Sequence, residues 1–146
     1  MGLLGVLETY LAALSGVYII LITVFVQSLV ASIAHRKQKH YVPGIVDEHL
    51  GHDSFVFRSH RTFMNSLENI PFMLATVFLG IFCNVDAFFL GLLVWVYALA
   101  RIIHMALYYK IVTEKNPSPR SYFFMIALLA QLTLLVTIGG HFVVML

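Results

Sequence analysis

Mostly apolar residues fill four long blocks of this chain, and polar residues gather in the segments between them. The blocks cover residues 10–34, 61–83, 87–110 and 120–146. Each is close to the roughly 20 residues that a helix needs to cross about 30 Å of hydrocarbon. The pattern therefore predicts an all-α integral membrane protein, a bundle of four transmembrane helices with up-down topology.

Composition argues against a soluble helical domain. Of the 146 residues, 60% are hydrophobic and only 11% are charged, and the mean hydropathy is +0.90. Too few polar residues remain to cover the surface of a soluble protein of this size. Neither a repeat nor a long linker divides the chain, so we expect a single domain over residues 1–146. The first block is longer than the core of a signal peptide and predicts a retained span.

Positive charge is distributed unevenly along the chain. The nine Lys and Arg residues lie in residues 35–60 and 111–119 or in the adjoining parts of the blocks, and both ends of the chain have none. Because cytoplasmic loops carry the excess of Lys and Arg, we expect both segments in the cytoplasm and both termini on the other side. An endoplasmic reticulum membrane and a bacterial inner membrane fit this topology equally. The net charge of +2 requires no nucleic-acid partner.

Two of the blocks contain polar residues at helical spacing. A spacing of four and then three residues in the second block, and of three and then four in the third, places each set on one helical face. These residues are Arg61, Asn65 and Glu68 in the second block and Arg101, His104 and Tyr108 in the third. Each block therefore has a polar stripe as well as an apolar surface.

The two stripes reach the same depth if the second and third blocks form a hairpin that turns at residues 84–85. Residues equally far from the turn then pair as Arg61 with Tyr108, Asn65 with His104, and Glu68 with Arg101. A charge deep in a membrane helix costs about 2.5–3.5 kcal/mol, so we expect Glu68 and Arg101 to be counter-ions. Either this ion pair only clips two helices together, or the stripes line a hydrated pocket for a charged ligand. The excess of arginine favours an anionic ligand.

The fourth block begins with a cation. Arg120 and Ser121 follow two prolines and fall in the first turn of the predicted helix, where free backbone N–H groups and the positive helix end favour an anion. The alternative is that Arg120 only anchors the helix at the membrane interface.

Metal binding is not expected. His49 and His52 have a spacing that suits a metal ion, but no cysteine or carboxylate set completes a zinc motif. Cys83 is the only cysteine, and we expect it to be a packing residue. Neither a Ser-His-Asp arrangement nor a phosphate-binding glycine loop can be found in the sequence.

Three segments together resemble the MAPEG family, the membrane-associated proteins in eicosanoid and glutathione metabolism. They are RTFMNSLENIPF at residues 61–72, RIIHMALY at residues 101–108 and the proline-containing loop that leads to Arg120. The LENIPF part is most similar to the microsomal glutathione transferase branch. The resemblance implies a homotrimer of four-helix subunits that binds glutathione as co-substrate between subunits, near the cytoplasmic side.

The resemblance also implies roles for individual residues. Arg120 is expected to stabilise the glutathione thiolate, with Ser121 as the alternative donor. The glutathione-binding residues are expected to be Arg61, Asn65, Glu68, Arg101, His104 and Tyr108, with Arg36 or Lys37 added from the adjacent subunit. Met64 and Phe124 stand where the prostaglandin E synthase branch has arginine and tyrosine, which weakens a prostaglandin assignment.

The expected activity is a membrane glutathione transferase of the detoxification type. It would conjugate the glutathione thiolate to lipophilic electrophiles that arrive from the bilayer, with a glutathione peroxidase activity toward lipid hydroperoxides. Two alternatives lie within the family: a non-catalytic lipid-binding scaffold, and an eicosanoid synthase or isomerase. A proton or ion pathway ranks last, because the polar stripes do not continue to the far side of the membrane.

Overall fold

The structure is a computed structural model that describes residues 2–145. Within this range the chain forms five helices and no strands. They are α1 (Leu3–Thr9), α2 (Leu11–Arg36), α3 (Phe55–Phe82), α4 (Ala87–Lys110) and α5 (Pro119–Met145). Among the described residues, the four helices α2 to α5 are long and apolar enough to cross a membrane. The prediction of an all-α chain with four spans is confirmed.

The second span is longer than the sequence pattern predicted, because α3 begins at Phe55 and not at residue 61. Ser54 caps the helix, and its Oγ accepts a hydrogen bond from the backbone N–H of Phe57 at 3.5 Å. With 28 residues, α3 is about 42 Å long at about 1.5 Å per residue. This exceeds the hydrocarbon thickness of about 30 Å, so α3 is long enough to reach beyond the hydrocarbon.

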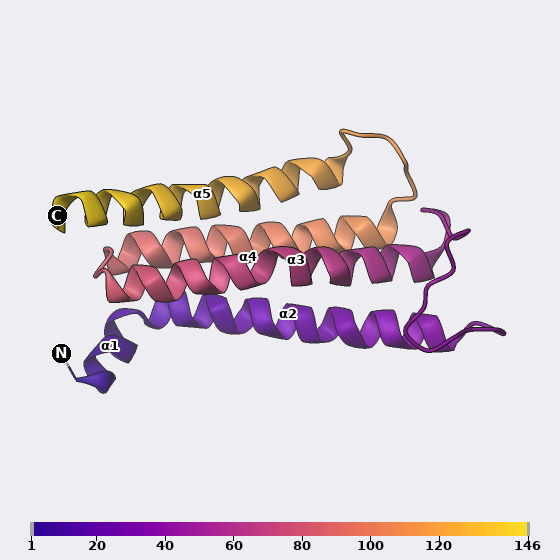
Figure 1. The fold of residues 1–146 in the computed structure, drawn as a ribbon, viewed down its shortest axis with the longest axis horizontal. Helices are drawn as coiled ribbons and strands as arrows, with labels where there is room; N and C mark the ends of the chain where they lie inside the picture. Colours follow the sequence, from indigo (N-terminus) through magenta and orange to yellow (C-terminus); the bar gives the residue numbers. More distant parts are fainter. Residues whose placement is uncertain (1, 146) are drawn as a thin grey trace.

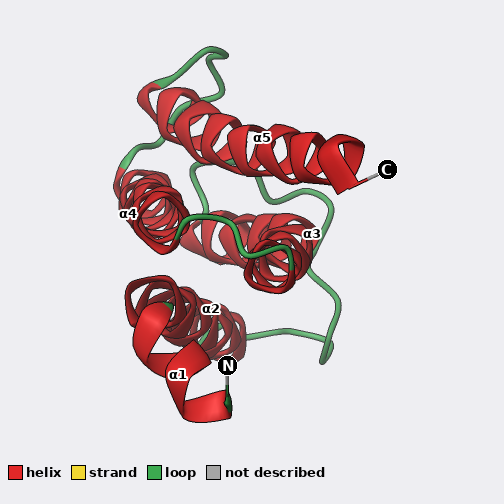
Figure 2. Ribbon diagram, turned by 90° about the vertical axis from the view of Figure 1, so that its left-hand side faces the viewer, coloured by secondary structure: helices red, strands yellow, loops and turns green. Residues whose placement is uncertain are grey.

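The long helices lie side by side, with both termini at one end of the bundle and the two longer loops at the other (Figure 1). Helix α3 packs against α2, α4 and α5, and α4 also packs against α2 and α5. Viewed end-on, α3 and α4 form the middle of the bundle, while α2 and α5 flank them on opposite sides (Figure 2). The two helices with polar stripes are therefore the central pair.

A tight turn joins α3 to α4, as predicted. Asn84 has a positive φ of 52°, a conformation that asparagine tolerates better than most residues. Asp86 caps α4 through a 2.8 Å hydrogen bond from the backbone N–H of Phe89. The hydroxyl of buried Tyr10 donates to the carbonyl of Val85 at 3.0 Å, which fastens the beginning of α2 to this turn.

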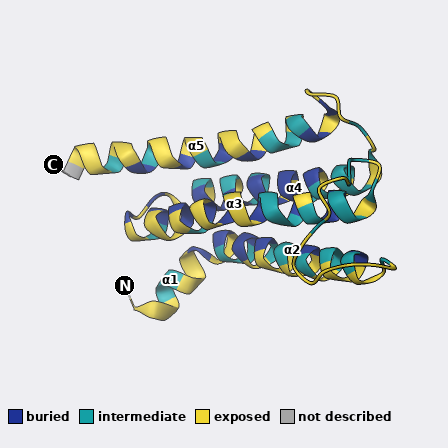
Figure 3. Cartoon of the chain, turned by 45° about the vertical axis from the view of Figure 1, so that its right-hand side comes forward, coloured by how far each residue is buried: buried dark blue, intermediate teal, exposed yellow. Residues whose placement is uncertain are grey.

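Glycines bring α2 close to α4. A Cβ added at Gly16 would lie 2.8 Å from Cγ1 of Val94, and one added at Gly91 would lie 3.0 Å from Cβ of Ala12. Small residues at such contacts let membrane helices approach closely. The outer faces of the helices are exposed (Figure 3). Large apolar side chains are among the exposed residues, with Phe72, Phe82 and Phe88 at 68, 80 and 78% exposure. An apolar exterior of this kind suits contact with lipid or with other subunits.

Candidate functional site

A cavity of about 430 Å³ lies at the loop end of the bundle, among α3, α4, the α4–α5 loop and the beginning of α5. Five of the residues predicted from the sequence line it: Asn65, His104, Tyr108, Arg120 and Ser121. We call it the Arg120 cavity. It brings residues from three helices together at the end where the two long loops meet.

Arg120 is the central cation of this cavity. It is 7% exposed, and its guanidinium carbon lies 4.1 Å from the centroid of the Tyr108 ring. Its Nε donates to Oγ of Ser118 at 3.3 Å, and its Nη2 donates to the carbonyl of Thr113 at 2.9 Å. Its Nη1 lies 3.4 Å from Nδ1 of His52. The guanidinium is thus held by the α4–α5 loop, by α4 and by the end of the loop that joins α2 to α3, which we call the first loop.

His52 reaches the cavity from the segment before α3. Its ring lies 5.8 Å from that of Tyr108 and 5.0 Å from that of Phe57, measured between centroids. Burial lowers the pKa of His52, and the positive charge of Arg120 lowers it further, while Glu114 acts in the opposite direction. The neutral imidazole is therefore the favoured form next to Arg120.

His104 and Tyr108 form the α4 side of the cavity. His104 is 5% exposed, and its Nδ1 has no hydrogen-bond partner within the described chain. Its ring lies 5.5 Å from that of Tyr108 and 6.2 Å from that of Phe124. A buried nitrogen without a partner costs free energy unless a ligand or water satisfies it, so His104 offers a polar contact that is still available.

Arg101 does not pair with Glu68, contrary to the prediction. Its Nη1 donates to Oδ1 of Asn65 at 2.8 Å and its Nη2 to Oγ of Ser66 at 3.0 Å, whereas Glu68 is exposed on α3. Glu68 is the residue of α3 that is level with Arg101 in the hairpin. Asn65 and Ser66 lie two to three residues nearer the loop end than Glu68, an offset of about 3–4.5 Å along the helix. The long arginine stem spans this offset, so an amide and a hydroxyl replace the expected carboxylate.

Ser121 is engaged in the loop before α5. Its Oγ accepts a hydrogen bond from the backbone N–H of Ser118 at 3.2 Å and donates to Oδ1 of Asn116 at 3.4 Å. These bonds shape the first turn of α5. They leave Ser121 less free than Arg120 to bind a ligand.

Five predicted residues do not line the Arg120 cavity. Arg61 and Glu68 are exposed on α3, and Arg36 and Lys37 are exposed at the end of α2. Arg101 is also absent from the lining of the cavity, but it contacts the lining residue Asn65. A single subunit thus brings about half of the predicted site together.

Comparison with known families identifies the chain. Residues 11–140, which include α2, α3, α4, most of α5 and the lining of the Arg120 cavity, match the MAPEG family. The chain belongs to the MAPEG family. It is accordingly an integral, multi-pass membrane protein. No curated protein and no solved structure matches it. MAPEG proteins include glutathione transferases and related synthases, so membership fits a glutathione transferase or an eicosanoid-related function.

Sequence reasoning missed several residues of this MAPEG site. His52, Glu114 and Ser118 line the cavity, and Thr113 binds Arg120 through its carbonyl. The only sequence feature that singled out His52 was its spacing from His49, which suggested a metal ion and not a guanidinium. Among the described residues, no group of three or more His, Cys, Asp or Glu side chains is placed to share a metal ion.

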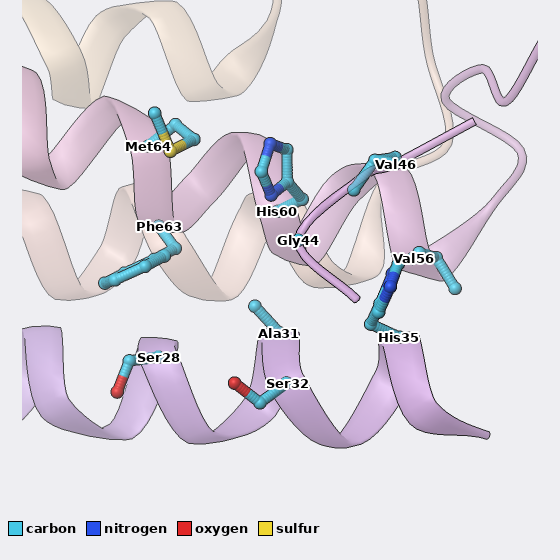
Figure 4. A pocket seen from close by; sticks show the side chains of 10 residues that line it. All are labelled: Ser28, Ala31, Ser32, His35, Gly44, Val46, Val56, His60, Phe63 and Met64. Atoms are coloured by element: carbon cyan, nitrogen blue, oxygen red, sulfur yellow. The ribbon is translucent and has the colours of Figure 1, made fainter. Parts of the chain in front are cut away.

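A second, smaller cavity of about 170 Å³ lies between α2 and α3 (Figure 4). Its lining includes Ser28, Ser32 and His35 from α2 and His60, Phe63 and Met64 from α3. It shares no lining residue with the Arg120 cavity. Nε2 of His35 lies 2.9 Å from the carbonyl of Val42, so this imidazole is engaged by the first loop.

Proposed function

We propose that this MAPEG protein is a membrane glutathione transferase in which Arg120 stabilises the glutathione thiolate. The observation that carries the proposal is the buried guanidinium of Arg120, fixed over the Tyr108 ring in a polar cavity. The volume of about 430 Å³ lies within the range of about 300–1,000 Å³ that is usual for ligand pockets.

The donor count of Arg120 leaves room for an anion. A guanidinium has five N–H donors. Ser118 occupies the N–H of Nε, Thr113 occupies one N–H of Nη2, and His52 occupies one N–H of Nη1. Each Nη nitrogen therefore retains one N–H. A free thiol has a pKa of about 8.5 and is mostly protonated at neutral pH. A guanidinium that donates to the sulfur favours the thiolate and lowers this pKa.

The proposed reaction follows from the thiolate. The thiol proton leaves to solvent at the loop end of the cavity, and the sulfur lone pair attacks an electrophilic carbon. A C–S bond forms, and the leaving group departs with its bonding electron pair. Lipophilic electrophiles would reach the site from the bilayer. The same thiolate would reduce lipid hydroperoxides, with a second glutathione forming the disulfide.

The exposed predicted residues support a site that is completed by a neighbouring subunit. Arg61 and Glu68 line no part of the Arg120 cavity. We propose that they contact glutathione in a homotrimer, in which Arg36 or Lys37 of the adjacent subunit completes the site. We also propose, from the distribution of Lys and Arg, that the loop end of the bundle faces the cytoplasm.

Purified protein in detergent tests the main proposal. We expect binding of glutathione and conjugation to a chlorinated nitrobenzene. Arg120→Ala should lower both the ultraviolet absorbance of the bound thiolate and kcat about tenfold, because about one pKa unit of thiol activation is lost. Glutathione affinity should change less, since other residues also bind the peptide. Lys110→Ala, which removes an exposed cation outside the cavity, is the matched control.

Two results would contradict the proposal. If Arg120→Ala retains the thiolate absorbance and the turnover of the wild type, Arg120 does not activate the thiol. If the wild type binds fatty acids but no glutathione at millimolar concentration, the non-catalytic lipid-binding scaffold is the better description. Retention of helical circular dichroism in Arg120→Ala separates a loss of chemistry from a loss of fold.

A further inference from the structure

The end of the first loop is fastened against the beginning of α3 at His52. Arg58, which is 7% exposed, donates from Nη1 to the backbone carbonyls of His52 and Asp53. Its Nη2 lies 3.5 Å from the carbonyl of Tyr109, at the end of α4. These contacts place the His52 ring beside Arg120 without using the imidazole itself.

We propose that His52 is a positioning residue for Arg120: its neutral imidazole accepts a hydrogen bond from Nη1 and holds the guanidinium over Tyr108, facing the cavity. The distance of 3.4 Å between Nη1 and Nδ1 is compatible with this bond. The inference deepens the proposed transferase function and rests on it for its catalytic consequence. The contact itself is independent of which ligand binds.

His52 is the side chain that restrains Nη1. Nε of Arg120 is bound by Ser118 and Nη2 by Thr113, so these two residues restrain one edge of the guanidinium. The Nη1 corner is restrained by His52. Loss of this acceptor would free Nη1 to turn away from the thiolate, although Arg120 would remain in the cavity.

The charge of His52 decides whether it can act as the acceptor. Protonated Nδ1 has no lone pair for Arg120, and the imidazolium would repel the guanidinium. The groups that influence the charge of His52 are Arg120 from α5, Arg58 and Arg61 from α3, and Glu114 from the α4–α5 loop. Burial of the ring favours its neutral form most strongly, and three cations against one carboxylate act in the same direction, so the pKa of His52 is lowered. Positioning should therefore be lost only as the pH falls below about 6.5.

Two substitutions of His52 distinguish its role as a hydrogen-bond acceptor from the packing of its ring. Asparagine offers an uncharged carbonyl acceptor at the position of Nδ1, whereas leucine offers none. We expect His52→Leu to raise the pKa of bound glutathione by about one unit and to lower kcat about tenfold, with little change in glutathione affinity. His52→Asn should stay within about threefold of the wild type. It should lose the steep acid limb of the pH–rate profile, because it has no proton to gain.

The control for these substitutions is His49→Leu. His49 lies in the same loop, is exposed and does not line the cavity, so kcat and the pH profile should match those of the wild type. The inference is overturned if His52→Leu has the wild-type kcat and pH profile. It is also overturned if His52→Asn loses as much activity as His52→Leu, because the imidazole would then act by packing alone.

A titration without glutathione tests the contact directly. In ¹⁵N-histidine-labelled protein, the pKa of His52 should lie below the ordinary histidine value of about 6.5. Its pKa should rise in Arg120→Gln and fall further in Glu114→Gln, since these changes remove charges of opposite sign. If the pKa of His52 stays at the ordinary value of about 6.5 in all three proteins, the contact with Arg120 is absent. If these shifts occur but the wild type does not conjugate glutathione, the transferase proposal fails while the positioning contact stands.

Discussion

Arg120 shows how a buried charge is accommodated in an apolar chain. A guanidinium removed from water requires compensation, and here it comes from hydrogen bonds to Ser118 and Thr113, from His52, and from the face of the Tyr108 ring. The ring contributes through its negative face and needs no hydroxyl for this. Tyr108 therefore has two separable properties, an aromatic face beneath Arg120 and a phenol group on the same ring.

Substitution of Tyr108 separates these properties. Tyr108→Leu removes the aromatic face, and we expect a loss in kcat/KM equivalent to about 0.5–2 kcal/mol, roughly twofold to thirtyfold. Tyr108→Phe keeps the face and should retain the thiolate absorbance of bound glutathione. If the two variants lose the thiolate equally, the phenol hydroxyl and not the ring face is the important group. Tyr122→Leu, which replaces an exposed tyrosine of α5 outside the cavity, is the control.

The central helix pair α3 and α4 is joined by a polar contact inside the bundle. Arg101 is 3% exposed and binds Asn65 and Ser66. Removal of an acceptor leaves a buried charge without a partner, which costs more than replacing both partners by apolar groups. The contact thus fixes the register between the two helices more than it adds stability.

A double-mutant cycle measures this contact. We expect Asn65→Leu and Arg101→Met each to lower the free energy of unfolding by about 1–3 kcal/mol. The double variant should lose less than the sum of the two, by about 0.5–3 kcal/mol, because neither polar group is then left unpaired. Thermal unfolding in detergent, followed by helical circular dichroism, gives the values. Asn65→Leu combined with Lys110→Met should be additive, and additivity in the Asn65–Arg101 cycle would show that the two residues are not coupled.

A single subunit surrounded by lipid would leave a charged side chain exposed on the surface of the bundle. Glu68 lies near the middle of α3 and is exposed, a position where a charge facing lipid costs about 2.5–3.5 kcal/mol. A neighbouring subunit, or a ligand between subunits, would remove this cost. This supports the expected homotrimer, in which α3 of one subunit faces another copy.

Assembly should therefore be required for glutathione binding. In mild detergent we expect three subunits by native mass spectrometry and binding of glutathione. In a harsher detergent that yields monomers with unchanged helical circular dichroism, glutathione affinity should fall about tenfold or more, because Arg61 and Glu68 then have only solvent beside them. Monomers that bind glutathione as tightly as the assembled protein would rule out a site shared between subunits.

Hydropathy alone was sufficient to predict the four spans and the α3–α4 hairpin. A helix in lipid satisfies its own backbone hydrogen bonds, and the bilayer thickness sets its length, so both are readable from a run of apolar residues. The periodic spacing placed Asn65 in one polar stripe and His104 and Tyr108 in another, and all three line the Arg120 cavity, whereas Arg61 and Glu68 of the same stripe as Asn65 are exposed. The resemblance of the motifs to the MAPEG family is confirmed by the match over residues 11–140.

The tertiary structure decided which polar groups meet. Equal distance from the turn predicted Glu68 beside Arg101, but helical rotation exposed the carboxylate, and the flexible arginine stem reached Asn65 and Ser66. The contact between His52 and Arg120 joins residues 68 positions apart, from a loop that has no helical period. Such a contact depends on how two loops fold over the end of the bundle, and this is a result of packing that no local pattern in the sequence records.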